Sequence, residues 1–301
     1  MKKKIISILA LVLILSLALV GLIACKDSRT GYPDADKYSV GGTTIDAASV
    51  KAINITWTGG QATITASDEY SNITFSEEND RDDDDYKIHY YLDSDHTLWI
   101  KPVAGNIGDD GIPSNWTAKQ LTFTMPNRTF ESITIEQHGA KLVATGLTAN
   151  SLSTYNTGYD TSVSNAHIFG DATLACQGLT GDVSFSGIAT GDLKVTAVLH
   201  SYVNVAAMPK SILASGKGKV TAYVPDTTAG FKVTYRSITT FHNTQFDGLY
   251  DATNPQDYDE AYVTKAYNGG QTQIILSCAT RDPLIGDTYN DTYLYKHTEE
   301  V

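Results

Sequence analysis

The stretch Leu179–Val198 (LTGDVSFSGIATGDLKVTAV) decides the fold, because it holds two short strand-like runs in tandem. The runs Asp182–Ser186 and Asp192–Ala197 each open with a Gly-Asp pair and start ten residues apart. Apolar and polar side chains alternate in both runs, which is the period of a strand with one buried face. The sequence therefore predicts two consecutive strands, each with one face in the core.

Gly-Asp pairs recur at a nearly constant interval around this stretch. They begin at Gly170, Gly181 and Gly191, which are eleven and then ten residues apart. Short strands repeated at such an interval are typical of a stacked, coiled β architecture. In this pattern Phe185 and Val195 are predicted to face inward, and the polar residues beside them are predicted to face outward.

Composition and patterning favour strands over most of the chain. Tyr (18 residues) far outnumbers Phe (8 residues), and Val, Ile and Thr are frequent. Outside the N-terminal segment, no window keeps the 3.6-residue period of an amphipathic helix. We therefore expect one all-β domain over residues 37–296, followed by a short tail at 297–301.

The N-terminus has the pattern of an export signal. Three lysines at positions 2–4 precede the uncharged, almost wholly apolar run Ile5–Ala24. The run is long for a secretory signal and long enough to span a bilayer. It ends in Leu-Ile-Ala-Cys, closing at Cys25, which resembles the lipobox of bacterial lipoproteins. That resemblance implies a signal peptide at 1–24 and lipid attachment at Cys25; an uncleaved anchor helix is the alternative.

Both alternatives place the rest of the chain outside the cytoplasmic membrane. Two acyl chains on one residue hold a protein on a membrane stably. The polar segment 25–36 is predicted to be a tether between the lipid and the domain. We expect an extracytoplasmic protein whose partner at this end is the cell membrane.

The charge excludes one class of partner. The chain has 22 basic and 34 acidic residues, a formal net charge of −12. Without the three N-terminal lysines the charge becomes −15, from 19 basic and 34 acidic residues. An acidic surface repels phosphate backbones, so we expect no nucleic acid partner.

Two cysteines remain beyond the N-terminal segment. Cys176 is in phase with the inward residues of its run, and Cys278 follows an apolar run. An exported compartment permits a disulfide. Two buried free thiols and one Cys176–Cys278 bridge therefore both remain open, with free thiols preferred.

No motif predicts a metal, cofactor or catalytic residue. Asp80, Asp82 and Asp84 fit positions of a calcium loop, but Asp85 and Tyr91 occupy the places that need Gly and Glu. We therefore expect a solvated acidic loop. The seven histidines show no zinc-site spacing, and neither a nucleophile elbow nor a P-loop is present.

Two further patterns leave alternatives open. Asp171, Asp182 and Asp192 could form a row like that of a polysaccharide-cleaving β-helix, although turn residues that bond their own backbone explain them more simply. A set of late tyrosines could bind a glycan or a protein, or could cap the open end of the stack, which we prefer. That set is Tyr250, Tyr258, Tyr262, Tyr267, Tyr289, Tyr293 and Tyr295.

The order of motifs resembles the putative-adhesin β-strand-repeat family of bacterial surface proteins, a domain of unknown function. The resemblance extends from about Val50 to Ser277 and implies a single right-handed β-solenoid without established catalytic residues. It departs from the family pattern around 151–166 and 240–268. The matching motifs are Ile53–Ile55, Gly60–Ile64, Thr97–Ile100, Met125-Pro126, the Gly-Asp strands at Gly181 and Gly191, and Gly218–Phe231.

These observations together predict a non-catalytic surface protein. We expect a lipid-anchored β-solenoid that presents an adhesion or interaction surface to an unknown surface protein or glycan. Two alternatives remain open: a carbohydrate-binding or polysaccharide-degrading β-helix, and an envelope sensor or scaffold that acts through protein contacts.

Overall fold

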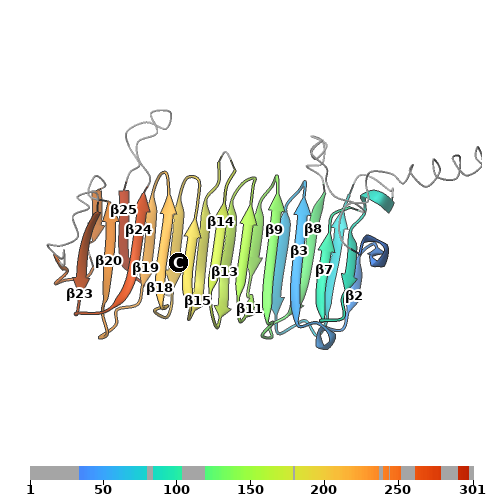
Figure 1. Ribbon diagram of the computed structural model, residues 1–301, viewed down its shortest axis with the longest axis horizontal. Coiled ribbons are helices and arrows are strands. Elements are labelled where there is room, and N and C mark those ends of the chain that lie inside the picture. The colour runs from blue at the N-terminus through green and yellow to red at the C-terminus, as the bar shows by residue number, and fades with distance from the viewer. Residues whose placement is uncertain are drawn as a thin grey trace, which may run out of the picture.

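The protein is all-β, as the sequence predicts. The computed structural model describes residues 34–79, 84–103, 119–178, 180–236, 240–243, 245–251, 262–278 and 291–297. Their strands form two large, mostly parallel sheets of 13 and 12 strands, which we call sheet A and sheet B. Figure 1 shows the strands side by side in one long stack. The helical elements of the described residues are the 3-10 turns η1 (Ala35–Lys37), η2 (Ala47–Ser49) and η3 (Asp84–Tyr86).

The strand order in each sheet differs from the order along the chain. Sheet A consists, in spatial order, of β1 (Ser39–Val40), β6 (His89–Leu92), β7 (Thr97–Lys101), β3 (Ala52–Thr58), β9 (Ser132–His138), β12 (Leu152–Asn156), β14 (Ala172–Cys176), β16 (Asp192–Thr196), β18 (Ser211–Gly216), β24 (Thr272–Cys278), β20 (Phe231–Arg236), β23 (Tyr262–Tyr267) and β22 (Tyr250–Asp251). Sheet B consists of β2 (Thr43–Ile45), β5 (Ile73–Glu78), β8 (Gln120–Pro126), β4 (Ala62–Ser67), β10 (Leu142–Thr145), β13 (Thr161–Ile168), β15 (Val183–Ala189), β17 (Ser201–Val205), β19 (Val220–Val224), β25 (Asp291–Lys296) and β21 (Thr240–Asn243), and β11 (Thr148–Ala149) also pairs with β13.

In the middle of the stack, from β12 to β19, successive strands alternate between the two sheets. Leu152 therefore pairs with Ala172, 20 residues later, and Leu193 pairs with Ile212, 19 residues later. The interval of ten or eleven residues between Gly-Asp pairs is thus half of the true repeat. Consecutive Gly-Asp pairs begin strands of opposite sheets.

Each end of the stack contains an inserted pair of strands. Near the N-terminal end, β3 lies between β7 and β9, and β4 lies between β8 and β10. Near the C-terminal end, β24 lies between β18 and β20, and β25 lies between β19 and β21 (Figure 1). Antiparallel strands follow at the outer edges, such as β6 on β7 and β23 on β20. The strands β3 and β4, and likewise β24 and β25, therefore have a neighbouring strand on both sides.

The core lies between the two sheets, where the inward residues of both meet. Phe185 of β15 and Val195 of β16 are completely buried, whereas Ser184 is half-buried and Lys194 is exposed. This confirms the predicted register of the tandem strands. The buried apolar residues form one cluster that extends from Ala47 to Leu294.

The glycines Gly170 and Gly191 lie where the backbone before one strand contacts the backbone before the neighbouring strand of the same sheet. A Cβ atom built on Gly191 would lie 2.5 Å from the carbonyl carbon of Gly170. No side chain fits into that space, so glycine is required at this corner. The Gly-Asp repeat is therefore a packing requirement of the strand starts.

Candidate functional site

A row of aromatic side chains crosses the outer face of sheet B near its C-terminal end. The ring of Tyr202 lies 5.3 Å from that of Tyr223, which lies 5.0 Å from that of Tyr295. Tyr293 lies 5.9 Å from Tyr295, and His242 stacks on Tyr293 at 4.5 Å. These centroid distances join the rings of β17, β19, β25 and β21 into one surface. We call these five residues the tyrosine strip.

The rings of the strip are half-buried by their neighbours on the sheet. Burial raises the pKa of the Tyr202 hydroxyl to about 12, and the nearby Tyr223 adds to this shift. Burial also raises the pKa of Tyr295 and of Tyr293. The hydroxyls therefore stay neutral over the whole physiological range, and the strip combines apolar rings with neutral donors.

A groove with a volume of 430 Å³ adjoins the strip on the same face. It crosses the starts of β10, β13, β15, β17 and β19, and we call it the sheet B groove. Ser162 and Ser184 lie side by side in it, with their hydroxyls 3.1 Å apart. Ser184 pairs with the much larger Tyr202. The Tyr202 ring therefore forms a wall at the end of the two serines.

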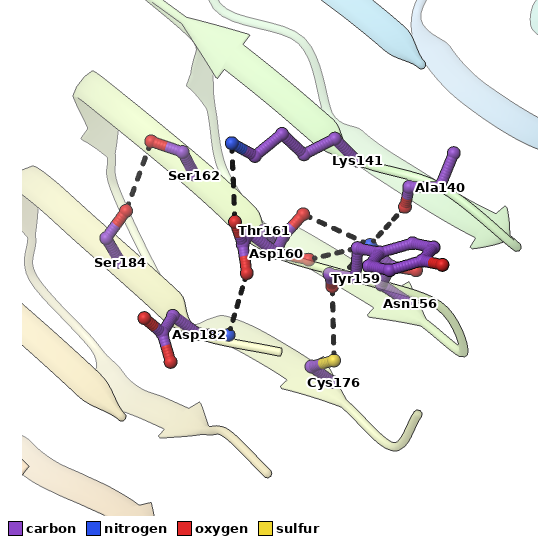
Figure 2. A network of polar contacts seen from close by, with 10 residues as sticks. All are labelled: Ala140, Lys141, Asn156, Tyr159, Asp160, Thr161, Ser162, Cys176, Asp182 and Ser184. Carbon is purple, nitrogen blue, oxygen red and sulfur yellow. Dashed lines mark hydrogen bonds and ion pairs between the residues drawn. The ribbon is translucent and has the colours of Figure 1, made fainter. Parts of the chain in front are cut away.

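Charged and polar groups surround the groove. The Lys141 ammonium is 3.3 Å from Asp160 Oδ2, and Asp160 Oδ1 accepts the backbone N–H of Asp182 at 3.2 Å (Figure 2). Asp182 Oδ1 in turn accepts the backbone N–H of His200, and His200 Nδ1 accepts that of Lys219. Side chains therefore cap successive strand starts along the groove. Asp182 Oδ2 has no partner among the residues that the structure describes.

The aspartates of the Gly-Asp pairs do not form a single row, so this alternative, which the sequence did not favour, is wrong. Asp171 and Asp192 begin strands of sheet A, where Asp171 Oδ1 accepts the backbone N–H of Asp192 at 2.8 Å. Asp182 begins a strand of sheet B and pairs in this way with Asp160. The Asp171 and Asp182 carboxylates do accept backbone N–H groups, whereas Asp192 Oδ1 accepts the Ser211 hydroxyl. However, these bonds reach the neighbouring strand start and do not stay within their own turn.

A buried polar column supports the corner beneath the groove. Asn156 Nδ2 lies 3.0 Å from the carbonyl oxygens of both Ala140 and Tyr159, and Cys176 Sγ donates to Tyr159 O at 3.3 Å (Figure 2). On the adjacent strand Gln137 Nε2 donates to Gly60 O at 3.0 Å. These inward residues satisfy turn carbonyls that would otherwise be buried without partners.

The late tyrosines lie in two different parts of the stack. Tyr267 of β23 is buried and packs against Phe231 and Phe246 at the end of the stack, as a cap does. Tyr250 lies on the edge strand β22, and Tyr262 lies on the neighbouring strand β23. Tyr293 and Tyr295 instead lie on the inserted strand β25 and belong to the strip. Tyr258 and Tyr289 lie outside the described residues.

Both described cysteines are free and buried, which confirms the free-thiol alternative. Burial raises the pKa of the Cys176 thiol, and Cys278 Sγ donates to Gly218 O at 2.6 Å. Each thiol therefore acts as a small core residue that donates a hydrogen bond to a turn carbonyl.

No group of three or more metal-ligating side chains occurs within the described ranges. Most of the acidic run, including Asp80 and Asp82, lies outside them. At the base of this run Lys119 is buried and forms an ion pair with Glu77, while Lys119 Nζ also donates to Tyr86 O at 2.6 Å. These contacts hold the two ends of the acidic segment together.

The N-terminal prediction lies outside the described residues, because Cys25 and the rest of 1–33 are not among them. Within the described part, no helix is long and apolar enough to cross a membrane. Cys25 thus stays a predicted lipid attachment site.

Sequence reasoning did not identify the groove or most of the strip. Asp160, His200 and Tyr202 stand at strand starts whose partners are distant in sequence. The register pairs Tyr202 with Thr221 and Asn204 with Tyr223, so the rings of Tyr202 and Tyr223 meet diagonally across two strands.

Comparisons with known proteins leave the family open. No family model and no curated protein matches the chain. Among solved structures, the chain is similar to the crystal structure of a "putative cell adhesion protein" from Clostridium sporogenes ATCC 15579. The TM-score is 0.35 and the identity 10%, and the match covers 87% of this chain and 100% of that one. Similarity at this level carries no functional argument, so the family resemblance stays a prediction.

Proposed function

We propose that this protein is a lipid-anchored, extracytoplasmic right-handed β-solenoid that binds a surface partner through the outer face of sheet B and catalyses no reaction. The tyrosine strip carries this proposal, because five aromatic rings in contact with one another cover neighbouring strands of one sheet face. Half-buried tyrosines offer rigid, amphipathic contact area, which is enriched in binding surfaces. The strip and the groove together form one continuous surface.

The handedness follows from a general rule of parallel sheets. A strand, a crossover and a second parallel strand in the same sheet form a right-handed connection in nearly all proteins. Here β12, β13 and β14 are such a unit, with β13 in the opposite sheet as the crossover. Repeating this unit produces a right-handed coil.

The absence of catalysis is supported by what the groove carboxylates do. Asp160 is occupied by Lys141 and by a backbone amide, and Asp182 accepts a backbone amide with one oxygen. Catalytic acids and bases are instead positioned against substrate in a site that excludes water. The groove lies on an open sheet face, which suits reversible binding.

Membrane anchoring is tested at Cys25. In Cys25→Ser the thiol that takes the lipid is absent, so the protein is expected in the soluble fraction or as an uncleaved precursor. Mass spectrometry of the wild-type protein should show a lipidated N-terminal Cys25. An intact segment 1–24 on the mature wild-type protein would contradict the anchor.

Binding is tested with cells that display the full chain. Attachment is measured to immobilised polysaccharides, mucin and extracellular-matrix proteins. Wild-type cells should attach to at least one of these, and Tyr223→Ser/Tyr295→Ser should reduce attachment at least about tenfold, or 1.4 kcal/mol. The control is Tyr155→Ser, which removes an outward tyrosine from sheet A. The proposal fails if no surface retains the cells, or if the strip variant attaches like wild type.

A further inference from the structure

We propose that the sheet B groove and the tyrosine strip bind a neutral polysaccharide, with one sugar unit against Tyr202 and the following units along the strip. This inference rests on the proposed function and names the ligand class for that surface. It is carried by the shape of the surface, by its unsatisfied polar atoms and by its charge.

The shape suits an extended ligand. The surface runs across seven strands of sheet B, from β10 through β13, β15, β17, β19 and β25 to β21. With neighbouring strands about 4.8 Å apart, its length is roughly 29 Å. A small molecule is usually enclosed in a pocket, whereas this surface is open along its length. A linear chain of several units can follow it from the groove to His242.

The chemistry of the groove suits a sugar ring. A pyranose has a face of C–H groups and a rim of hydroxyls, so it needs an apolar ring beside hydrogen-bonding groups. Tyr202 supplies the ring, and its own hydroxyl is buried beneath the surface. Asp182 Oδ2 is a free acceptor, and the Ser162 and Ser184 hydroxyls line the same groove. Convergent polar groups of this kind fix the orientation of a ligand.

The charge selects a neutral chain over an acidic one. The net charge of −12 repels polyanions, and the Lys141 ammonium is already paired with Asp160. The Lys219 ammonium lies over the Tyr293 ring, 4.3 Å from its centroid. These two groove lysines are therefore engaged with neighbours, which leaves a free carboxylate oxygen as the charged group turned to the ligand.

This surface fits a protein partner less well than it fits a polysaccharide. Protein interfaces are anchored by large apolar or aromatic side chains inserted into the partner. The strongly exposed large apolar residues of the described part are Val40, Tyr159, Phe169 and Tyr262. None of them belongs to the strip or lines the groove. The strip offers ring surface at the level of the sheet, without a protruding anchor.

The test is affinity electrophoresis of the full chain in detergent. Separate gels contain a neutral β-glucan, mannan, galactan or arabinoxylan, and polygalacturonate serves as the acidic gel. At least one neutral polysaccharide should retard the protein. Tyr202→Ala should raise the dissociation constant at least about tenfold, and Asp182→Asn about fivefold, since Asn keeps the backbone cap but loses the charged acceptor. Inhibition by soluble oligosaccharides should strengthen with chain length.

Matched variants separate binding from folding. Asp171→Asn changes the equivalent corner carboxylate of sheet A, whose Oδ1 accepts the backbone N–H of Asp192, and should bind like wild type, as should Tyr155→Ala. Ser184→Tyr fills the groove from an outward position, so it should abolish retardation while the unfolding temperature stays unchanged. This variant keeps the test valid if Tyr202→Ala fails to fold.

Three outcomes overturn the inference. They are the absence of retardation in every neutral gel, stronger retardation by polygalacturonate, and retardation that survives both Tyr202→Ala and Ser184→Tyr. If cells attach to a protein through the strip while no polysaccharide retards the chain, the ligand class is wrong and the proposed function stands. If cells attach to nothing, the proposed function itself fails.

Discussion

The outer face of sheet B has two halves with the same interior and different exteriors. In the half from β5 to β15, hydroxyl residues stand in register, with Thr74, Thr124, Thr65 and Thr145 on neighbouring strands. In the half from β17 to β21, aromatic rings occupy most of the outward positions. Beneath both halves the inward positions are buried and mostly apolar. The core thus dictates only one side of each strand and leaves the other side free for function.

The hydroxyl half is largely satisfied by itself. The Thr44 and Thr74 hydroxyls are 3.0 Å apart, and those of Thr145 and Ser164 are 3.1 Å apart. Such cross-strand pairs stabilise a sheet by a few tenths of a kcal/mol to about 1 kcal/mol each. The aromatic half instead leaves the Tyr202 hydroxyl without a partner. The halves therefore differ in how far their outward polar groups bond to one another.

The largest effect is expected in the interior that the halves share. Phe185→Ala removes a fully buried ring beneath Ser184 and should lower the free energy of unfolding by about 3–5 kcal/mol. The measurement is urea unfolding followed by circular dichroism and by tyrosine fluorescence, and both probes should give one midpoint. Ser184→Ala should stay within about 0.5 kcal/mol of wild type. Equal losses in the two variants would show that the strand register is wrong.

A smaller loss is expected at the corner beneath the groove. Asn156→Ala leaves the turn carbonyl of Ala140 without the Asn156 donor and that of Tyr159 with only the Cys176 thiol, which should cost about 2–3 kcal/mol. Thermal and urea unfolding measure the loss. Tyr155→Phe is the control, because it removes only the exposed hydrogen bond to Gln177. If Asn156→Ala is no less stable than the control, water replaces the amide at this corner.

Exchanging the chemistry of the two halves tests their functional difference. Tyr223→Thr places a hydroxyl residue in the aromatic half and removes two ring contacts, which should cost about 0.5–1.5 kcal/mol each and weaken ligand binding. Thr124→Tyr places a ring in the hydroxyl half and should leave binding unchanged, because β8 is not among the strands that line the sheet B groove. A gain of binding in Thr124→Tyr would mean that any outward ring suffices.

The smallest effect is a pH dependence confined to the aromatic half. The pKa of Tyr202 is raised to about 12 in the folded state from 10.0, so the folded state holds its proton more tightly. The stability contributed by the neutral hydroxyl is complete below pH 10 and is lost as pH rises towards 12. Unfolding temperatures measured from pH 9 to pH 12 should therefore fall less steeply in Tyr202→Phe. Parallel curves for the two proteins would contradict the burial of this hydroxyl.

The sequence by itself determined the strands and their faces, because alternation is a local property. It placed Phe185 and Val195 inward, and its two tandem runs correspond to β15 and β16. The alternation of apolar and polar residues is weak in β12 and at the start of β13, because the inward residues Thr154, Asn156 and Thr161 are polar. Their polarity hides the alternation, because Asn156 serves turn carbonyls that only the folded corner brings near.

The tertiary structure alone decided which strands are neighbours, and hence where the surface lies. Strand β25 could have followed β21 at the end of the stack, but it lies between β19 and β21. This insertion puts Tyr295 beside Tyr223, although they are 72 residues apart in the chain. Strand alternation specifies a face and not a neighbour, so the strip and the groove arise only when distant strands pair.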